Sequence, residues 1–254
     1  MKKFARKNII KMSDQKFLDL CFDYYLGKKI NWKNPQTYNE KLQWLKIYDR
    51  QDSYTKMVDK YEAKEYVKNI IGEEYIIPTI GIYDKFENID FEKLPQQFVM
   101  KCTHDSGGLV ICKDKSKLNL KEAKRKINQC LKVNYFNCWK EWPYKNVKPR
   151  IIIEKYMTND DSDGINDYKF FCFNGKVKLL FIATDRVNEN EETKFDFYDE
   201  NFNHLPIKNG HPNALVPPSK PLNFEKMKEL AEILSKDIPH LRVDFYEING
   251  KIYF

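Results

Sequence analysis

The Asn-Gly pairs at residues 174–175 and 249–250 constrain the fold more than any other feature of this sequence. Asn174-Gly175 and Asn249-Gly250 each separate two runs that are rich in aromatic and β-branched residues. A type I′ turn needs a positive φ at both central residues, which asparagine and glycine adopt most easily, so each pair predicts an antiparallel hairpin. We therefore expect hairpins over residues 168–183 and 242–254, and a looser β pair over 195–205.

Helical patterns stand between these β segments. Capping residues and apolar stripes predict helices that start at Thr37, at Asp59, at Asn119 and after Pro221. Short apolar runs predict further strands that start at Ile76, Phe98 and Ile151. This alternation of helices and hairpins predicts an α/β protein, built as α+β lobes with largely antiparallel sheets.

Charge and hydropathy narrow the function classes. The 254 residues include 44 basic and 37 acidic side chains, a net charge of +7, which suits an anionic ligand. The charges are mixed along the chain, so we do not expect nucleic-acid binding. No apolar run is long enough to span a bilayer, and the basic segment from Met1 to Met12 predicts at most weak peripheral contact with a membrane. We expect a cytoplasmic protein whose cysteines are reduced.

One strand ends in a lysine and a glycine-rich turn. Phe98–Cys102 is a short β run that carries Lys101, and His104-Asp105-Ser106-Gly107-Gly108 follows it. Backbone N–H groups of such a turn approach phosphate closely, and a lysine adds a compact positive charge. The turn lacks the Gly-Lys-Ser/Thr of a P-loop. An ordinary hairpin turn is the alternative interpretation.

Other charged residues stand at the ends of apolar strands. Glu154 follows the apolar run Ile151–Ile153. It is interpreted either as the polar end of a strand or as part of a hinge between lobes whose backbone pairs with an adenine edge. Arg242 and Asp244 share one strand face, which predicts either a structural ion pair or a Mg²⁺ ligand beside a phosphate-binding arginine. Lys60 stands where a helix dipole disfavours a cation, so it is either a surface lysine or one aimed at an anion. The segments 167–169 and 184–186 are interpreted as solvated strand ends.

Together these residues resemble the TupA-like branch of the ATP-grasp superfamily, which is named for teichuronopeptide biosynthesis. The resemblance extends from about residue 35 to the end, and its ordered segments are Thr37–Leu45, Asp59-Lys60, Phe98–Lys101 with Ser106–Gly108, Ile153–Tyr156, Asp167–Phe170 and Arg242–Phe245. It implies an ATP-grasp fold that holds a nucleotide between two lobes. The expected domains are an N-terminal helical segment (1–56) that packs on the core, a first lobe (57–150) and a second lobe (151–254).

The resemblance also implies a role for each matching residue, with ATP and Mg²⁺ as cofactors. Lys60 and Lys101 correspond to the nucleotide-binding lysines, and His104, Ser106, Gly107 and Gly108 form the loop over the phosphates. The adenine hinge comprises Glu154, Lys155, Tyr156 and Met157. Asp244 is the implied magnesium ligand, while Arg242, Lys169 and Arg186 face the phosphates or an acyl intermediate. The family's last strand leads to a further metal-binding glutamate, so we expect the sequence to be cut short before it.

The implied activity is an ATP-dependent carboxylate–amine ligase. Its expected partners are ATP, an acidic glycan or other carboxylate acceptor, and an amine or amino-acid donor. A uronic acid of a capsule or another cell-envelope polysaccharide is one candidate acceptor. Two alternatives stay open: a glycan kinase or glycosyltransferase-like enzyme of the same biosynthesis, and a non-catalytic nucleotide-binding scaffold. Asp161-Ser162-Asp163 is the sole candidate for a transferase metal motif, and a solvated loop is its plainer interpretation.

Overall fold

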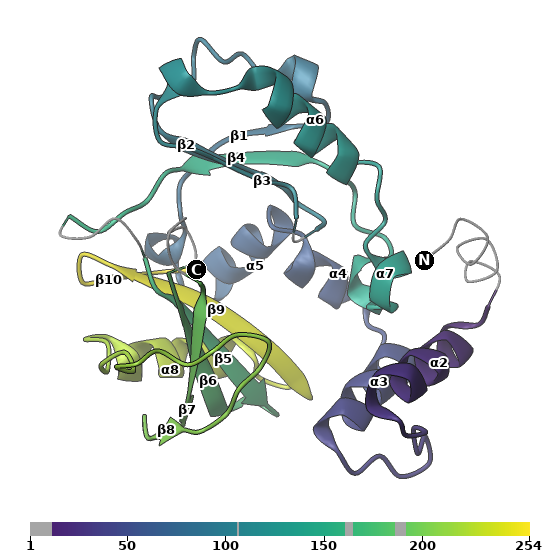
Figure 1. The fold of residues 1–254 in the computed structure, drawn as a ribbon. Coiled ribbons are helices and arrows are strands. Elements are labelled where there is room, and N and C mark those ends of the chain that lie inside the picture. Colours follow the sequence, from purple (N-terminus) through teal and green to yellow (C-terminus); the bar gives the residue numbers. More distant parts are fainter. Residues whose placement is uncertain (1–11, 106, 161–164, 186–191) are drawn as a thin grey trace. The chain divides into compact units, whose positions relative to one another are not determined.

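The computed structural model describes residues 12–105, 107–160, 165–185 and 192–254. These residues form two compact units (Figure 1). The first comprises the described parts of Met1–Ala63 and Thr79–Glu154, and the second those of Lys64–Pro78 and Lys155–Phe254. These units are defined by contacts within the chain and not by function. The expected functional domains 1–56, 57–150 and 151–254 therefore stay a prediction.

A four-stranded sheet forms the centre of the first unit. Its strand order is β1 (Thr79–Tyr83), β4 (Ile151–Lys155), β2 (Phe98–Cys102) and β3 (Leu109–Cys112). β1 pairs antiparallel with β4, and β2 pairs antiparallel with β3. The predicted strand at Ile76 instead begins at Thr79, because Pro78 has no N–H for a strand ladder.

Helix α6 (Leu120–Cys130) lies across this sheet in Figure 1. The predicted cap is present, since the Asn119 side chain accepts a hydrogen bond from the Glu122 N–H. Ala123 and Ile127 of the helix are buried with Phe98, Met100 and Cys102 of β2. Alternate residues of β2 therefore face the core, which leaves Lys101 on the opposite face of the sheet.

Short helices complete the first unit: α2 (Asp14–Leu26), α3 (Tyr38–Tyr48), α4 (Asp52–Val58), α7 (Phe136–Trp139), and the 3-10 turns η2 (Phe86–Asn88), η3 (Lys115–Lys117) and η4 (Trp142–Tyr144). The capping box predicted at Thr37 and Glu40 is present at the start of α3. Backbone N–H groups of Thr37 and Asn31 bond to the Glu40 carboxylate and lower its pKa to about 2.

Helix α5 (Glu62–Ile71) continues the chain from the first unit into the second, where η1 (Glu73–Tyr75) follows it. The helix was expected to start at Asp59. The Asp59 carboxylate does accept hydrogen bonds from the backbone N–H groups of Tyr61 and Glu62, so it caps a helix whose regular part begins three residues later. Gly72, with φ 116°, ends the helix as predicted.

The second unit is built on a six-stranded antiparallel sheet. Its order is β10 (Lys251–Tyr253), β9 (His240–Ile248), β5 (Asp167–Phe173), β6 (Lys176–Thr184), β7 (Lys194–Asp199) and β8 (His204–Leu205). Both predicted hairpin turns are confirmed: φ is 49° and 75° at Asn174 and Gly175, and 50° and 72° at Asn249 and Gly250. The looser β pair between β7 and β8 is also present.

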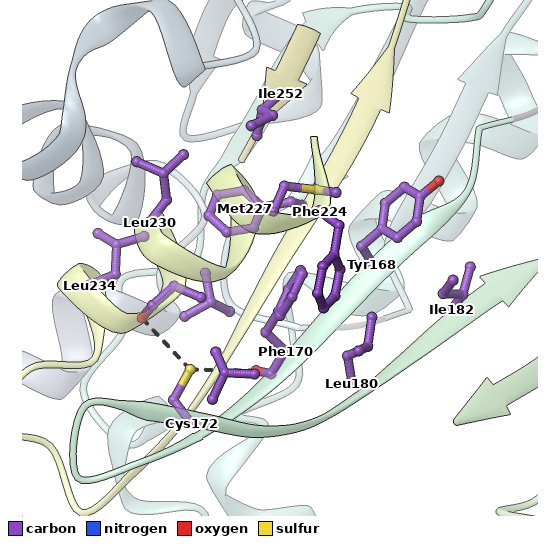
Figure 2. Close-up of a cluster of buried hydrophobic side chains, with 14 of the residues drawn as sticks. Tyr168, Phe170, Cys172, Leu180, Ile182, Phe224, Met227, Leu230, Leu234 and Ile252 are labelled. Carbon is purple, nitrogen blue, oxygen red and sulfur yellow. Dashed lines mark hydrogen bonds between the residues drawn. The ribbon is translucent and has the colours of Figure 1, made fainter. Parts of the chain in front are cut away.

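Helix α8 (Phe224–Leu234) packs on one face of this sheet (Figure 2). The predicted apolar face is buried, and it comprises Met227, Leu230, Ala231 and Leu234. Together with Phe224 these residues form one cluster with Phe170 of β5 and Phe245 of β9. Burying each such side chain contributes about 1.5–3 kcal/mol to stability. Since side chains alternate along a strand, the residues between them lie on the other face.

The predicted fold class is confirmed, because helices alternate with antiparallel strands in both units. Within the described residues, we find no helix whose length and apolar character would let it cross a membrane.

Candidate functional site

Lys101 and Glu154 form an ion pair on neighbouring strands of the first unit. The Lys101 Nζ lies 2.6 Å from Oε2 of Glu154, whose side chain is only 5% exposed. A buried carboxylate needs a partner that compensates its charge, and Lys101 supplies one. The Lys101 side chain itself keeps 26% of its surface exposed, so an anion can reach it.

Lys60 approaches the same strand from the turn before α5. Its Nζ donates to the backbone oxygens of Cys102, at 3.0 Å, and of Asp105. Desolvation lowers the pKa of the Lys60 ammonium; Asp105 opposes this shift, and the nearby charge of Lys101 adds to it. We call Lys60, Lys101, Asp105 and Glu154 the lysine cluster. It places two cations beside the glycine-rich turn.

The glycine-rich turn links β2 to β3. A Cβ on Gly108 would stand 2.6 Å from Sγ of Cys102, whereas one on Gly107 would meet nothing within 4 Å. Gly108 is therefore required by close packing, while Gly107 is open to an approaching group. His104 is 2% exposed, and its Nε2 lies 3.1 Å from the Cys130 oxygen at the end of α6. His104 thus fastens the turn, and its predicted contact with the cofactor stays a prediction. Ser106 lies outside the described residues.

The predicted adenine hinge follows β4. Glu154 is buried at the end of the strand, Lys155 is exposed, and Tyr156 and Met157 are half-buried. The Lys155 N–H donates to the oxygen of Pro78 at 3.0 Å, so the main chain is held at this point. Whether the segment pairs with adenine stays a prediction.

A second group of charges lies on the second unit's sheet, on the face opposite α8. In the antiparallel register, Lys169 of β5 stands directly opposite Asp244 of β9. The Lys169 Nζ lies 2.6 Å from Oδ2 of Asp244 and 2.7 Å from Oδ2 of Asp167. Arg242, on the same strand as Asp244, donates two hydrogen bonds to it. Its Nε lies 2.7 Å from Oδ1 and its Nη2 lies 2.9 Å from Oδ2. We call Asp167, Lys169, Arg242 and Asp244 the carboxylate cluster.

Electrostatics keep Asp244 ionised within this cluster. Desolvation raises the pKa of its carboxyl, but the charges of Arg242 and Lys169 outweigh that effect and the pKa falls below its ordinary value. The Arg242 side chain remains 48% exposed, and the Asp244 side chain 31%. An anion or a cation from solvent can therefore reach the cluster.

The interpretation of residues 167–169 as a solvated strand end is wrong. Asp167 is 1% exposed, Tyr168 is 7% exposed, and the Lys169 side chain is 11% exposed. The pairing of β5 with both β6 and β9 places this segment inside the sheet, which no local pattern reveals. Asp167 is consequently a member of the cluster that sequence reasoning missed. In the second segment, Thr184 and Asp185 are half-buried, and Arg186 lies outside the described residues.

The structure thus groups the candidate residues in two sets. Lys60, Lys101 and Glu154 meet in the first unit, and Lys169, Arg242 and Asp244 meet in the second. That both sets face one nucleotide stays a prediction. Among the described residues, no three His, Cys, Asp or Glu side chains are grouped as a metal site. Asp161, Ser162 and Asp163 lie outside the described residues.

Comparisons with known proteins give a family and distant structural likenesses. The model of the TupA-like ATP-grasp family matches residues 40–254. No curated protein sequence matches the chain. Among solved structures, the D-alanine–D-alanine ligase from Bacillus anthracis complexed with ATP shares 16% identity, with a TM-score of 0.40 and coverage of 77% of this chain and 51% of that one.

Two other solved structures are similar at the same level. The ATP-grasp ligase PsnB, complexed with minimal precursor, Mg and ADP, has 9% identity, a TM-score of 0.43 and coverage of 85% and 55%. The D-cycloserine synthetase DcsG has 15% identity, a TM-score of 0.41 and coverage of 78% and 60%. The chain spans about half of these proteins' lengths, and the likeness is too low to carry an argument about the site. The family match, which covers most of the chain, shows that this protein belongs to the TupA-like ATP-grasp family.

Proposed function

We propose that this protein is an ATP-dependent ligase that joins a carboxylate to an amine. The observation that carries the proposal is the lysine cluster. Two lysines from separate segments lie beside an open glycine, and desolvation together with its neighbour lowers the pKa of one of them. Two adjacent cations are stabilised by a multiply charged anion, and a nucleotide triphosphate suits a turn that presents backbone N–H groups. Family membership supports the same ligand.

Lys101 and Lys60 would bind the phosphates from one side. Lys101 already contacts Glu154, and a phosphate oxygen would take its place as the main partner of Nζ. Lys60 would turn from the carbonyl oxygens of Cys102 and Asp105 toward the same anion. Both lysines would then stabilise the charge that develops on the transferred phosphoryl group.

The carboxylate cluster fits a magnesium site in its donor chemistry. Mg²⁺ is typically held by one or two carboxylates, with phosphate oxygens and waters completing the octahedron. Asp244 is ionised and partly exposed, and Asp167 lies on the same face of the sheet. Lys169 and Arg242, which now hold Asp244, would move onto the phosphates or the acceptor. When bound, the metal would offset phosphate charge during the transfer.

The reaction would pass through an acyl phosphate of the acceptor. A carboxylate oxygen attacks the γ-phosphorus and ADP leaves; an amine then attacks the acyl carbon, inorganic phosphate leaves, and the amine loses a proton. The exposed guanidinium of Arg242 suits the acceptor carboxylate, because arginine binds carboxylates through two parallel hydrogen bonds. The excess of basic residues favours an acidic acceptor, and a uronic acid of a surface polysaccharide fits that chemistry.

The test is ADP release with a panel of uronic acids as acceptors and hydroxylamine as a general amine. A ligase converts the acyl phosphate to a hydroxamate, and omission of either the acid or Mg²⁺ stops ADP release. Asp244→Asn and Lys101→Met should each lower the rate by roughly two orders of magnitude or more, the range for removal of one transition-state contact. Lys178→Met is the matched control. This lysine is exposed on the sheet of the second unit, where it forms an ion pair with Glu200 and belongs to neither cluster.

Other outcomes identify the alternatives. A stable phosphorylated acceptor formed without hydroxylamine indicates a kinase, and consumption of a sugar nucleotide without ATP indicates a glycosyltransferase. Mg-ATP binding with no ADP release across the panel indicates a nucleotide-binding scaffold. Each of these results would replace the ligase proposal.

A further inference from the structure

Asp59, the residue before Lys60, is a buried carboxylate with an unusual set of partners. It is 2% exposed. One oxygen, Oδ1, accepts hydrogen bonds from the N–H groups of Tyr61, at 2.9 Å, and Glu62, at 3.4 Å, and so caps α5. The other, Oδ2, lies 2.8 Å from Nη2 of Arg150. A helix cap needs only the first oxygen, so the pair with Arg150 calls for a separate explanation.

Arg150 comes from 91 positions along the chain, just before β4. Its Nη2 also lies 2.9 Å from Oε1 of Glu62, and its guanidinium carbon stands 4.9 Å from the centre of the Tyr61 ring. The arginine therefore contacts the residue before Lys60 and both residues after it. Only 15% of its side chain is exposed, which strengthens these charged contacts relative to surface pairs.

Backbone hydrogen bonds close a ring around Lys60. The Lys60 N–H donates to the oxygen of Thr103 at 3.0 Å, and the Thr103 N–H donates to the oxygen of Arg150 at 2.9 Å. The Arg150 side chain then returns to Asp59. Thr103 is fully buried, at 0% exposed. The ring fixes the main chain of Lys60 against the end of β2, which also carries Lys101, and against the start of β4, whose other end carries Glu154.

We infer that the Arg150–Asp59 ion pair is a positioning device that aims Lys60 at the nucleotide phosphates. The nucleotide part of this inference rests on the proposed function, whereas the placement of Lys60 is testable without a ligand. Lysine has four rotatable bonds, and its ammonium holds a fixed place only when its main chain is fixed. Arg150 and Asp59 need no contact with the nucleotide, so they are positioning residues and not catalytic ones.

The first measurement is the acylation rate of Lys60 by acetic anhydride in the full-length protein, followed by proteolytic digestion and mass spectrometry that assigns acetylation to each lysine. Arg150→Gln and Asp59→Asn should each speed this reaction by roughly tenfold or more, the effect of losing one hydrogen bond to a charged group. Asp59→Asn is the milder variant, because asparagine also caps helices well and the fold should survive. Lys64 is the internal reference, since it is 6% exposed and its Nζ donates to the Ile77 oxygen at 2.7 Å. Its rate should not change.

A matched variant separates positioning from general destabilisation. Arg50 also holds an aspartate, with Nη2 at 2.9 Å from Oδ2 of Asp14, and both side chains are partly buried in the same unit. Arg50→Gln should leave the acylation rate of Lys60 unchanged. If Arg150→Gln and Asp59→Asn also leave it unchanged, or if Lys64 accelerates equally, the inference is overturned.

The second measurement is the dissociation constant of Mg-ATP by calorimetric titration. Arg150→Gln should weaken binding roughly tenfold, and the loss should vanish in a Lys60→Met background, because coupled residues are not additive. Faster acylation of Lys60 with unchanged Mg-ATP affinity would overturn the inference and leave the proposed function intact. Absence of Mg-ATP binding by the unaltered chain would refute the proposed function, while the acylation rates would still decide whether Arg150 and Asp59 fix Lys60.

Discussion

Replacement of Lys101 should destabilise the first unit as well as weaken nucleotide binding, and the two effects can be separated. Glu154 has a side chain only 5% exposed and lies 2.6 Å from the Lys101 Nζ. Breaking a buried ion pair by removing one partner costs about 3–5 kcal/mol. Since 26% of the Lys101 side chain is exposed, we expect Lys101→Met to lower the free energy of unfolding by about 3 kcal/mol, at the low end of that range.

The double variant should be more stable than this single one. Lys101→Met combined with Glu154→Gln leaves no buried charge at the pair, and neutral replacements of buried pairs are often close to neutral in stability. We therefore expect the double variant to lose about 1 kcal/mol or less, so adding Glu154→Gln to Lys101→Met should recover about 2 kcal/mol through the coupling of the two residues. Mg-ATP affinity, in contrast, should remain low in the double variant, because the phosphate-binding charge is still absent.

Tryptophan fluorescence during urea unfolding is a suitable assay. The chain has 4 tryptophans, Trp32, Trp44, Trp139 and Trp142, and all belong to the first unit, so the signal reports on the unit that holds the pair. The control is a pair in the same unit, Lys148 with Asp84, whose side chains are 65% and 59% exposed. Lys148→Met and Asp84→Asn should show a far smaller coupling than the substitutions at Lys101 and Glu154. Equal stability of Lys101→Met and the unaltered chain would refute the reasoning.

Three further predictions concern protons and packing. The pKa of Asp244 is lowered in the folded state, so its carboxylate should contribute stability that is present above about pH 4 and lost as the pH falls. Unfolding followed by circular dichroism should show a smaller loss of stability between pH 5 and 3 for Asp244→Asn than for the unaltered chain. A lowered pKa of Lys60 in the free protein predicts that Mg-ATP binding takes up a proton at alkaline pH, measurable by calorimetry in buffers of different ionisation enthalpy, and that Lys60→Arg abolishes the uptake. Gly108→Ala should cost about 1–3 kcal/mol in urea unfolding, because its Cβ would clash with Cys102, whereas Gly107→Ala should stay within about 0.5 kcal/mol of the unaltered chain; equal effects would contradict the packing argument.

Local elements could be predicted from the sequence where a few adjacent residues satisfy a backbone requirement by themselves. The turn at Asn174-Gly175 needs two positive φ angles, and the helix after Asn119 needs an acceptor for its first N–H groups. Both requirements are met within a few residues. The same holds for β2, whose alternating burial separates Lys101 from its apolar neighbours.

Contacts between distant segments could not be predicted in this way. The sequence placed the start of a helix at Asp59, but it did not reveal that Arg150, far along the chain, binds the carboxylates of Asp59 and Glu62. Likewise, Asp167 reads as a polar strand end until β9 pairs with β5 and encloses it. The burial of a charged residue depends on which strand lies beside it, and the order of strands is determined by the packing of the whole sheet.

The pairing of β5 with β9 ties the candidate site to the hydrophobic core. In the observed register, Phe170 faces α8 with Val243 as its cross-strand neighbour, while Lys169 stands opposite Asp244 on the other face. A slip of one residue in either strand would turn its charged side chain toward Phe224 and remove the apolar one from the core. Unpaired burial of a charge and loss of core packing would both oppose this slip. The energy that packs α8 on the sheet therefore also keeps Lys169 and Asp244 in contact, so the carboxylate cluster needs no loop or ligand to hold it together.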